Sequence, residues 1–193
     1  MNSPTNILRF QIDFLGPFHV SSSPDEGLDR TVDREVPLPA SGIKGLMRAQ
    51  ATHILMVPAS IVDSIFGSKK CEAAWLWTDP EFATDPIPEK VARLRLSDSD
   101  DGAAESGLLM LGEHLWATTA SFTLTMRHPL EADEAARHRL VLRAAARSIV
   151  GLGGSRRRGE GWVNVFDVNP DGTPAAWSVE DSSRLLDLRE SAA

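Results

Sequence analysis

The sequence has a single cysteine, no long apolar run and a deficit of positive charge, and each absence excludes a class of protein. A lone Cys71 cannot form an internal disulfide, and without companion cysteines it makes no zinc site of the usual kind. No apolar stretch approaches the roughly 20 residues that cross a bilayer, and residues 1–6 lack the basic start and apolar middle of a signal peptide. These absences predict a soluble, cytoplasmic protein with no structural metal and no membrane contact.

The formal net charge of -7 argues against a protein that neutralises phosphates over its whole surface. Non-specific affinity for nucleic acids depends on clustered Lys and Arg. The charge is unevenly distributed, however, because acids gather in residues 98–105, in residues 131–134 and toward the C-terminus. Five arginines lie close together in sequence, and they leave room for a local basic face: Arg143, Arg147, Arg156, Arg157 and Arg158.

Length and periodicity together predict one α+β domain. A chain of 193 residues, 42% of them hydrophobic, is long enough for one domain with a full core and short for two. Alternation and flanking turn residues predict strands at residues 8–15, 74–77, 121–126 and 162–168. Helical spacing predicts helices at residues 41–55, 60–66, 131–150 and 179–188. Ser41 is the N-cap candidate of the first helix, and Gly67 ends the second. The third helix is expected to bury Val141, Leu142, Ala145 and Ile149.

Residues 91–97 and 108–111 have the pattern of two extended arms around an acidic, glycine-containing tip. This pattern predicts a short protruding hairpin. The order strand, helix, strand or hairpin, strand, helix, strand fits a ferredoxin-like or RRM-like sandwich with its helices on one face of the sheet. Many functions occur on this fold, so the fold alone decides none of them.

A glycine-rich stretch, Gly151–Gly161, lies between the third predicted helix and the last predicted strand. Glycines at this density permit positive φ angles and close approach of the backbone to a ligand, and arginines supply donors for phosphate oxygens. The stretch is no Walker loop and no dinucleotide fingerprint, since it ends a helix and enters a strand. A phosphate cradle and a turn with solvated arginines both remain open. The candidate contacts are Gly153, Gly154, Ser155, Arg156, Arg157, Arg158, Gly159 and Gly161.

The start of the first predicted helix carries Ser41, Lys44 and Arg48 at spacings of three and four residues. These spacings place the three side chains in a row on one side of the helix. Such a row near a helix N-terminus can hold successive phosphates of a single strand, helped by the helix dipole. An ordinary amphipathic helix with a solvated face is the alternative.

The two segments together resemble a known family, the RAMP superfamily (repeat-associated proteins) of type III CRISPR effector complexes. Pro39–Gly45 followed by Arg48 resembles the family's Pro-Gly-Ser-Ser-Leu-Lys-Gly, then Arg, signature. Gly151–Gly161 is similar to the family's C-terminal glycine-rich loop, including its Arg-Arg-Gly-x-Gly ending. Further similarities follow in the same order: Ile65–Ser68 to the family's Phe-Gly motif, Leu76–Asp79 to the next strand and aspartate, and Arg93–Glu113 to the thumb-like hairpin.

The resemblance implies an RRM-like domain over residues 1–168, with a thumb-like insertion at about residues 79–113, and an acidic tail at residues 169–193. It also implies a subunit that packs beside other RAMP-type subunits and holds a guide RNA by its phosphates. Guide specificity would then come from base pairing with a complementary target RNA. The implied guide contacts are the glycine-rich loop residues named above together with Ser41, Gly42, Lys44, Gly45 and Arg48.

In the catalytic branch of that family, an aspartate before the Pro-x-Ser motif cleaves target RNA with a divalent metal. Residues 28–33 are similar to the family's Ile-Asp-x-x-Val-x-x-Asp, so Asp29 is the catalytic candidate and Asp33 the alternative. One carboxylate can help to bind a metal such as Mg²⁺ or orient a ribose 2′-OH. The acids of the polar loop 21–34 could instead simply solubilise it. His19 either touches RNA or is structural. A non-catalytic scaffold and a small phosphate- or nucleotide-binding domain remain the alternatives.

Overall fold

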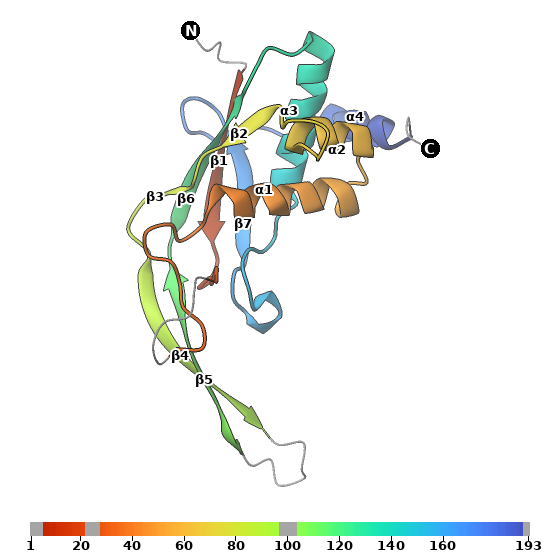
Figure 1. Ribbon diagram of the computed structural model, residues 1–193. Helices are drawn as coiled ribbons and strands as arrows, with labels where there is room; N and C mark the ends of the chain where they lie inside the picture. Colours follow the sequence, from red (N-terminus) through yellow and green to blue (C-terminus); the bar gives the residue numbers. More distant parts are fainter. Residues whose placement is uncertain (1–5, 22–27, 97–103, 191–193) are drawn as a thin grey trace.

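The computed structural model describes residues 6–21, 28–96 and 104–190, arranged as a sheet with helices on one side and a long hairpin below (Figure 1). The strands are β1 Ile7–Phe14, β2 Trp75–Trp77, β3 Glu81–Phe82, β4 Ile87–Leu96, β5 Ala104–Trp116, β6 Thr119–Met126 and β7 Val163–Val168. The helices are α1 Ala40–Ala49, α2 Ala59–Phe66, α3 Ala132–Arg147 and α4 Val179–Glu190, with a π-helical turn η2 at Gln50–Ile54 and a 3-10 turn η3 at Arg156–Arg158. None of the described helices is both long and apolar enough to span a membrane.

The main sheet is antiparallel and has the strand order β2-β6-β1-β7, with β3 pairing with β6. The segment with α1 and α2 connects β1 to β2, and β6 lies between those two strands. In the same way α3 connects β6 to β7, and β1 lies between them. Two interleaved β-α-β units of this kind make the ferredoxin-like arrangement, so the predicted fold is confirmed.

The core lies between the sheet and the helices, as the alternating pattern predicted. Phe10 and Ile12 of β1 are buried, and the ring of Phe10 stacks on that of its cross-strand partner Phe122 with 5.0 Å between ring centroids. The second layer comes mainly from α3, where the predicted inward residues Val141, Leu142 and Ala145 are buried, and the predicted Ile149, just after the end of the helix, is buried as well. Burying large apolar side chains of this kind contributes about 1.5–3 kcal/mol each.

The first helix begins differently from the prediction. Ser41 is not its N-cap, because α1 starts at Ala40 after Pro39, and no side chain of the helix itself caps the turn. Instead the Ala40 N–H donates to Oδ1 of Asp79 at 2.6 Å, from the segment between β2 and β3. A carboxylate at this position satisfies a free N–H group and complements the helix dipole. The cap is therefore supplied by a residue distant in sequence.

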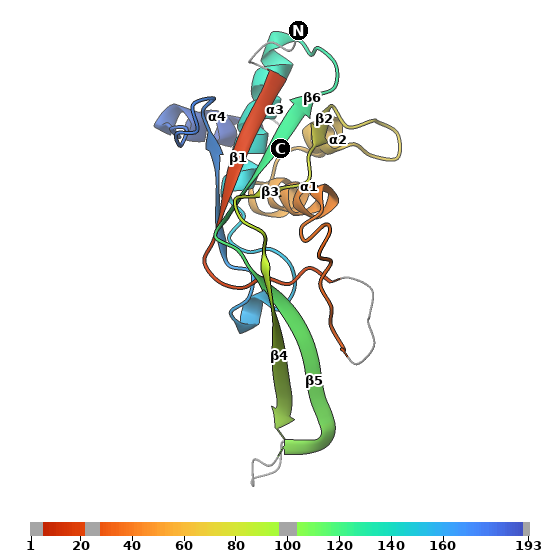
Figure 2. The same cartoon turned by 90° about the vertical axis from the view of Figure 1, so that its left-hand side faces the viewer.

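The hairpin β4–β5 forms a sheet of its own and projects away from the body (Figures 1 and 2). Its arms are longer than predicted, because β4 begins at Ile87 and β5 extends to Trp116. Residues 104–107, predicted as part of the tip, belong to β5, and the rest of the predicted tip, up to residue 103, lies outside the described residues. At the base, Oε2 of Glu89 accepts hydrogen bonds from Trp116 and His114 across the two strands.

The C-terminal segment docks on α3, and α4 occupies the predicted position. Arg143 and Arg147 each donate from Nε to the buried Asp167 at 2.6 Å, and both guanidinium groups lie over the ring of Trp177. Both arginines are thus used within the fold. The local basic face anticipated from five neighbouring arginines is therefore limited to the three in the glycine-rich loop.

Lowering the pH is expected to destabilise the fold through the buried His138. Its Nδ1 lies 3.3 Å from the Trp75 indole N–H that donates to it, and burial lowers the pKa of this histidine below its ordinary value of 6.5. The unfolded chain takes up a proton that the folded chain excludes. The free energy of unfolding therefore decreases by up to about 1.4 kcal/mol for each pH unit below the ordinary histidine pKa of 6.5. Urea unfolding between about pH 7 and about pH 5 measures this slope. His138→Gln, whose amide oxygen can accept from Trp75, should show a shallower slope; an equal slope would contradict the assignment.

Candidate nucleic-acid interface

The glycine-rich loop has a backbone path that other residues cannot follow. Gly153 and Gly161 have φ angles of +70° and +75°. A Cβ atom at Gly153 would lie 2.2 Å from the carbonyl oxygen of His19, and one at Gly161 would lie 2.0 Å from that of Leu152. These contacts are far inside the van der Waals distance, so both positions require glycine. The predicted dependence of the loop on glycine is thus steric as well as conformational.

Two backbone N–H groups of the loop are used to anchor it. The Gly154 N–H donates to the carbonyl of His19 at 2.8 Å, and the Gly161 N–H donates to the carbonyl of Pro17 at 2.7 Å. Both acceptors belong to the segment that leaves β1. These donors are therefore not open to an anion, contrary to a cradle in which every loop N–H faces a ligand. The side chains of the loop remain available for anion binding.

The side chains of Arg156, Arg157 and Arg158 supply that capacity. The three residues form η3 between Ser155 and Gly159, which have φ angles of 56° and 85°, and all three are exposed. Their guanidinium groups form no hydrogen bond or ion pair within the part of the chain that the structure describes. Exposed guanidinium groups can bind phosphate oxygens through two parallel hydrogen bonds. The loop thus presents three positive charges at its outer end.

A buried carboxylate, Glu160, joins this loop to two other segments. Only 4% of Glu160 is exposed. It forms ion pairs with Arg93 of β4 and with Arg30, the latter at 3.5 Å, and its Oε1 lies 3.7 Å from Nδ1 of His114 in β5. Arg93 also donates to the hydroxyl of Ser155 at 3.2 Å. The loop, the hairpin and the segment of residues 28–34 are therefore held together at one point. Sequence reasoning missed this role, since the partners lie on three separate elements.

His19 lies beneath the loop and is fully buried. Neither ring nitrogen has a hydrogen-bond partner among the described residues, and a Cβ atom at Gly154 would lie 3.6 Å from Nδ1. Burial, followed by the positive charge of Arg30, lowers the pKa of this histidine. An enclosed, neutral imidazole fits the structural interpretation of His19 better than direct contact with RNA.

Asp29 lies beside the middle of β5 with its side chain exposed. Its N–H donates to the carbonyl of Leu111 at 2.8 Å, and the Leu111 N–H donates to Oδ2 of Asp29 at 2.8 Å. The backbone of the next residue, Arg30, forms an isolated parallel β-bridge with Gly112 of β5. One carboxylate oxygen is thus fixed by β5, whereas Oδ1 has no partner in the described structure. Asp29 is held in place and remains accessible to a ligand.

Asp33, the alternative catalytic candidate, has a turn-forming role. Its Oδ1 accepts hydrogen bonds from the N–H groups of Glu35 and Val36, both at 2.8 Å. This is the pattern by which aspartate stabilises a tight turn. Among the described residues, no three His, Cys, Asp or Glu side chains converge closely enough to hold a metal ion. A divalent metal at Asp29 would therefore need most of its ligands from RNA and water.

The predicted row on α1 is divided among different environments. Arg48 donates to the carbonyl of Gly67 at 2.6 Å and to Asp63 at 2.8 Å, so it connects α1 to the end of α2. Nζ of Lys44 lies 5.1 Å from the centre of the Trp77 ring. Burial first, and then the charges of two neighbouring arginines, lower the pKa of Lys44. Ser41, Gly42 and Gly45 are exposed on the first turns of the helix.

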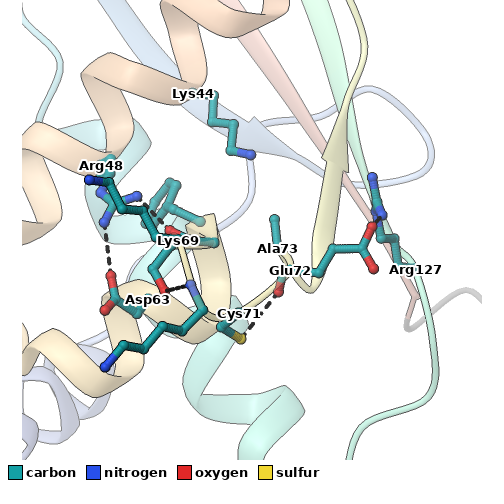
Figure 3. Close-up of a pocket in the computed structure, with 12 residues that line it drawn as sticks. Lys44, Arg48, Asp63, Lys69, Cys71, Glu72, Ala73 and Arg127 are labelled. Atoms are coloured by element: carbon teal, nitrogen blue, oxygen red, sulfur yellow. Dashed lines mark hydrogen bonds and ion pairs between the residues drawn. The ribbon is translucent and has the colours of Figure 1, made fainter.

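Lys44 and Arg48 line a pocket with the segment that follows α2 (Figure 3). Figure 2 shows that segment above α1 and to its right, whereas the glycine-rich loop lies below α1 and to its left. The pocket with Lys44 and Arg48 and the glycine-rich loop with its three arginines therefore lie on different sides of α1. Which of them contacts RNA remains a prediction.

The topology, the projecting hairpin and the glycine-rich loop define a ferredoxin-like domain with one elaborated end. A family model described as the RAMP superfamily matches residues 11–164, which is most of the chain. The chain therefore belongs to the RAMP superfamily, as the two sequence motifs predicted. No curated protein sequence matches it significantly.

Two solved structures of similar fold come from Type III-B Cmr-beta complexes. A chain in the cryo-EM structure of the apo state has a TM-score of 0.70 and 13% identity, covering 88% of this chain and 99% of that one. A chain in the complex bound to cognate target RNA has a TM-score of 0.64 and 12% identity, covering 83% of this chain and 96% of that one. At such identities the similarity establishes a shared fold that includes nearly the whole of each neighbour.

Proposed function

We propose that this chain is a backbone subunit of a type III CRISPR effector ribonucleoprotein and that it binds guide RNA by its phosphates. Its superfamily membership and its structural neighbours support this proposal, since one neighbour belongs to a complex bound to target RNA. The observation that carries it is the glycine-rich loop. Three exposed arginines project from a backbone that only glycine permits, and a buried carboxylate fixes that backbone to the hairpin.

The chemistry of the loop suits a ligand of variable sequence. Guanidinium groups recognise phosphate oxygens without regard to the base, so they position a strand and leave its base edges free. Sequence specificity then comes from pairing between guide and target. A subunit that recognises only the backbone can serve guides of any sequence.

The hairpin supports assembly with other subunits. Apolar side chains on it remain exposed, among them Ile87 at 68% and Leu109 at 53%. A two-stranded hairpin on its own is marginally stable in water, and three or more strands or a packed partner are needed for independent stability. Packing against neighbouring RAMP-type subunits would cover these side chains. Such packing would also make the net charge of -7 compatible with RNA binding, because only part of the protein surface would then face RNA.

Replacing the three loop arginines is expected to weaken guide binding uniformly across guide sequences. For a single-stranded nucleic acid, the logarithm of the binding constant falls linearly with the logarithm of the salt concentration, with a slope of about 0.7 for each phosphate contact. Losing three contacts should therefore reduce the slope by about 2. Fluorescence anisotropy with single-stranded RNA at several salt concentrations measures this slope. The test variant changes Arg156, Arg157 and Arg158 to Ala. The matched control changes three exposed arginines elsewhere to Ala: Arg137, Arg184 and Arg189.

The control variant has the same net charge as the test variant. An identical decrease in slope for both would show that overall charge, and not the loop, governs RNA binding. That result would remove the main support for the proposed contact.

Co-purification tests the function as a whole. Expressed together with the other subunits of a type III effector complex from the same source, the chain should be isolated in a complex that contains RNA of defined length, which sequencing identifies as guide. A complex without RNA, combined with saturable nucleotide binding by the chain alone, would instead support the small-ligand alternative.

A further inference from the structure

Lysine is scarce in this chain, and its distribution is uneven. Four lysines occur, at positions 44, 69, 70 and 90. Three of them, Lys44, Lys69 and Lys70, line one pocket between α1, the segment after α2 and the end of β6 (Figure 3). The fourth, Lys90, is exposed on β4 of the hairpin. Most of the chain's lysines therefore line this one pocket.

The arginines of the pocket already have partners. Arg48 is paired with Asp63 at 2.8 Å, and Arg127 is paired with Glu72. Those two pairs account for both acids that line the pocket. The three ammonium groups consequently have no carboxylate partner in the described structure. An anion that entered this pocket would meet an excess positive charge of about three, which attracts it.

The pocket offers charge but no aromatic face for a base. Nζ of Lys44 lies over the Trp77 ring. The ring of Phe66 stacks on the same Trp77 ring, with 5.5 Å between the ring centroids. The indole N–H of Trp77 donates to the sulfur of Met47. The site can therefore hold a phosphate group, but it has no exposed platform on which a base could stack.

We propose that this pocket binds a backbone phosphate of single-stranded RNA and forms a second contact site, separate from the glycine-rich loop. The inference rests on the proposed function. It adds Lys69 and Lys70 to the proposed RNA contacts and places them in one pocket with Lys44. The neighbouring face of α1 is open, because Gly42 and Gly45 are exposed and no atom comes within 4 Å of a Cβ built at Gly45. A strand can therefore approach the helix closely beside the pocket.

The lining favours RNA over an acidic peptide. A peptide bound with useful affinity needs apolar anchors or backbone hydrogen bonds beside its acids. Most of the side chains that line this pocket are charged or polar, and its aromatic residue Phe66 is buried. Ammonium groups on long, exposed stems, as in Lys69 and Lys70, act as point charges that adapt to a flexible chain of phosphates.

Lysine acylation of the assembled ribonucleoprotein tests the proposal. The complex is treated with an amine-reactive acetylating reagent before and after ribonuclease digestion, and mass spectrometry measures modification at each lysine. Bound phosphate keeps an amine protonated and covered, so Lys44, Lys69 and Lys70 should react about fivefold more slowly or less while RNA is present. Lys90, on β4 and outside the pocket, is the internal reference, and the rates of the three pocket lysines should change about fivefold more than the rate of Lys90. Digestion should restore the rates of the three pocket lysines.

The outcomes separate this inference from the proposed function. If the complex contains RNA and the pocket lysines react equally before and after digestion, the pocket site is wrong while guide binding stands. Protection that persists after the RNA has been removed would assign the pocket to an acidic partner protein and overturn the proposal. A complex that contains no RNA would contradict the proposed function and this inference together.

Two variants give an independent measure. Lys69→Gln with Lys70→Gln removes two charges from exposed positions, and the salt slope of RNA binding should decrease by about 0.7, the value of one phosphate contact. Lys90→Gln changes one exposed charge of the hairpin and should leave the slope unaltered. Equal slopes for the wild type and the double variant would contradict the site.

Discussion

Gly161→Ala is expected to lower the free energy of unfolding by about 3–5 kcal/mol and to abolish guide binding by the loop. The φ angle of +75° alone disfavours an alanine by about 1–2 kcal/mol. In addition, the new Cβ atom would lie 2.0 Å from the carbonyl oxygen of Leu152, so the loop must move. The movement breaks the hydrogen bonds that connect the loop to Leu152 and Pro17. Urea unfolding followed by tryptophan fluorescence measures the loss.

Two other glycines serve as controls for this prediction. Gly159 has a φ angle of 85° but no atom within 4 Å of its Cβ position, so Gly159→Ala should lose only the conformational 1–2 kcal/mol or so. Gly45 lies in α1 with open space around it, and Gly45→Ala should be neutral or stabilising by up to about 1 kcal/mol. If Gly161→Ala were no less stable than Gly159→Ala, the close approach of the loop to Leu152 would be refuted.

Damage to the loop should extend to the hairpin, because Glu160 precedes Gly161 directly. Glu160 is the buried partner of Arg93 in β4 and of Arg30 beside the catalytic candidate. Displacing its carboxylate leaves two guanidinium groups without their shared anion. The proposed guide contact of the loop, the position of the hairpin and the position of Asp29 are therefore coupled through one residue.

Local periodicity was sufficient to predict the fold. Alternation identified β1, β6 and β7, and helical spacing identified α1 and α3, because each of these elements buries one face against the same core. The failures occurred where a partner distant in sequence decides the structure. Asp79 caps α1 in place of Ser41, and β5 continues through residues predicted as a tip because β4 pairs with it.

The candidate site was predictable only in part for the same reason. Glycine density and arginine content identified the loop, since both are properties of a contiguous stretch. The pairing of Glu160 with Arg93 joins residues far apart in sequence, and no short motif encodes it. Likewise, the use of Arg143 and Arg147 by Asp167 could not be inferred from composition, which counts charges without their partners. The lysine pocket appears only when the segment after α2 folds back onto α1.

Asp29→Asn is expected to reduce cleavage of target RNA about 100-fold or more while guide and target binding are unchanged. Among the described residues, no three His, Cys, Asp or Glu side chains gather to hold a metal. A positioned carboxylate that assists proton transfer from a 2′-OH, typically contributing about 10²–10⁴-fold, would therefore carry most of the effect. Asparagine keeps an oxygen that can accept the hydrogen bond from the Leu111 N–H. The substitution therefore removes the charge without releasing the segment from β5. Cleavage of a labelled complementary RNA by the assembled complex measures the rate.

Asp33→Asn is the matched control, since the carboxylate of Asp33 is used in a turn. It should leave cleavage within about twofold of the wild type, because an amide oxygen can still accept both N–H groups. Chelation of divalent ions should abolish wild-type cleavage if RNA and Asp29 together hold a metal such as Mg²⁺. An Asp29→Asn complex that cuts target RNA at the wild-type positions and rate would instead identify the chain as a scaffold subunit. In that case Oδ1 of Asp29 has no chemical role, and the hydrogen bond that its Oδ2 accepts from the Leu111 N–H only anchors the loop.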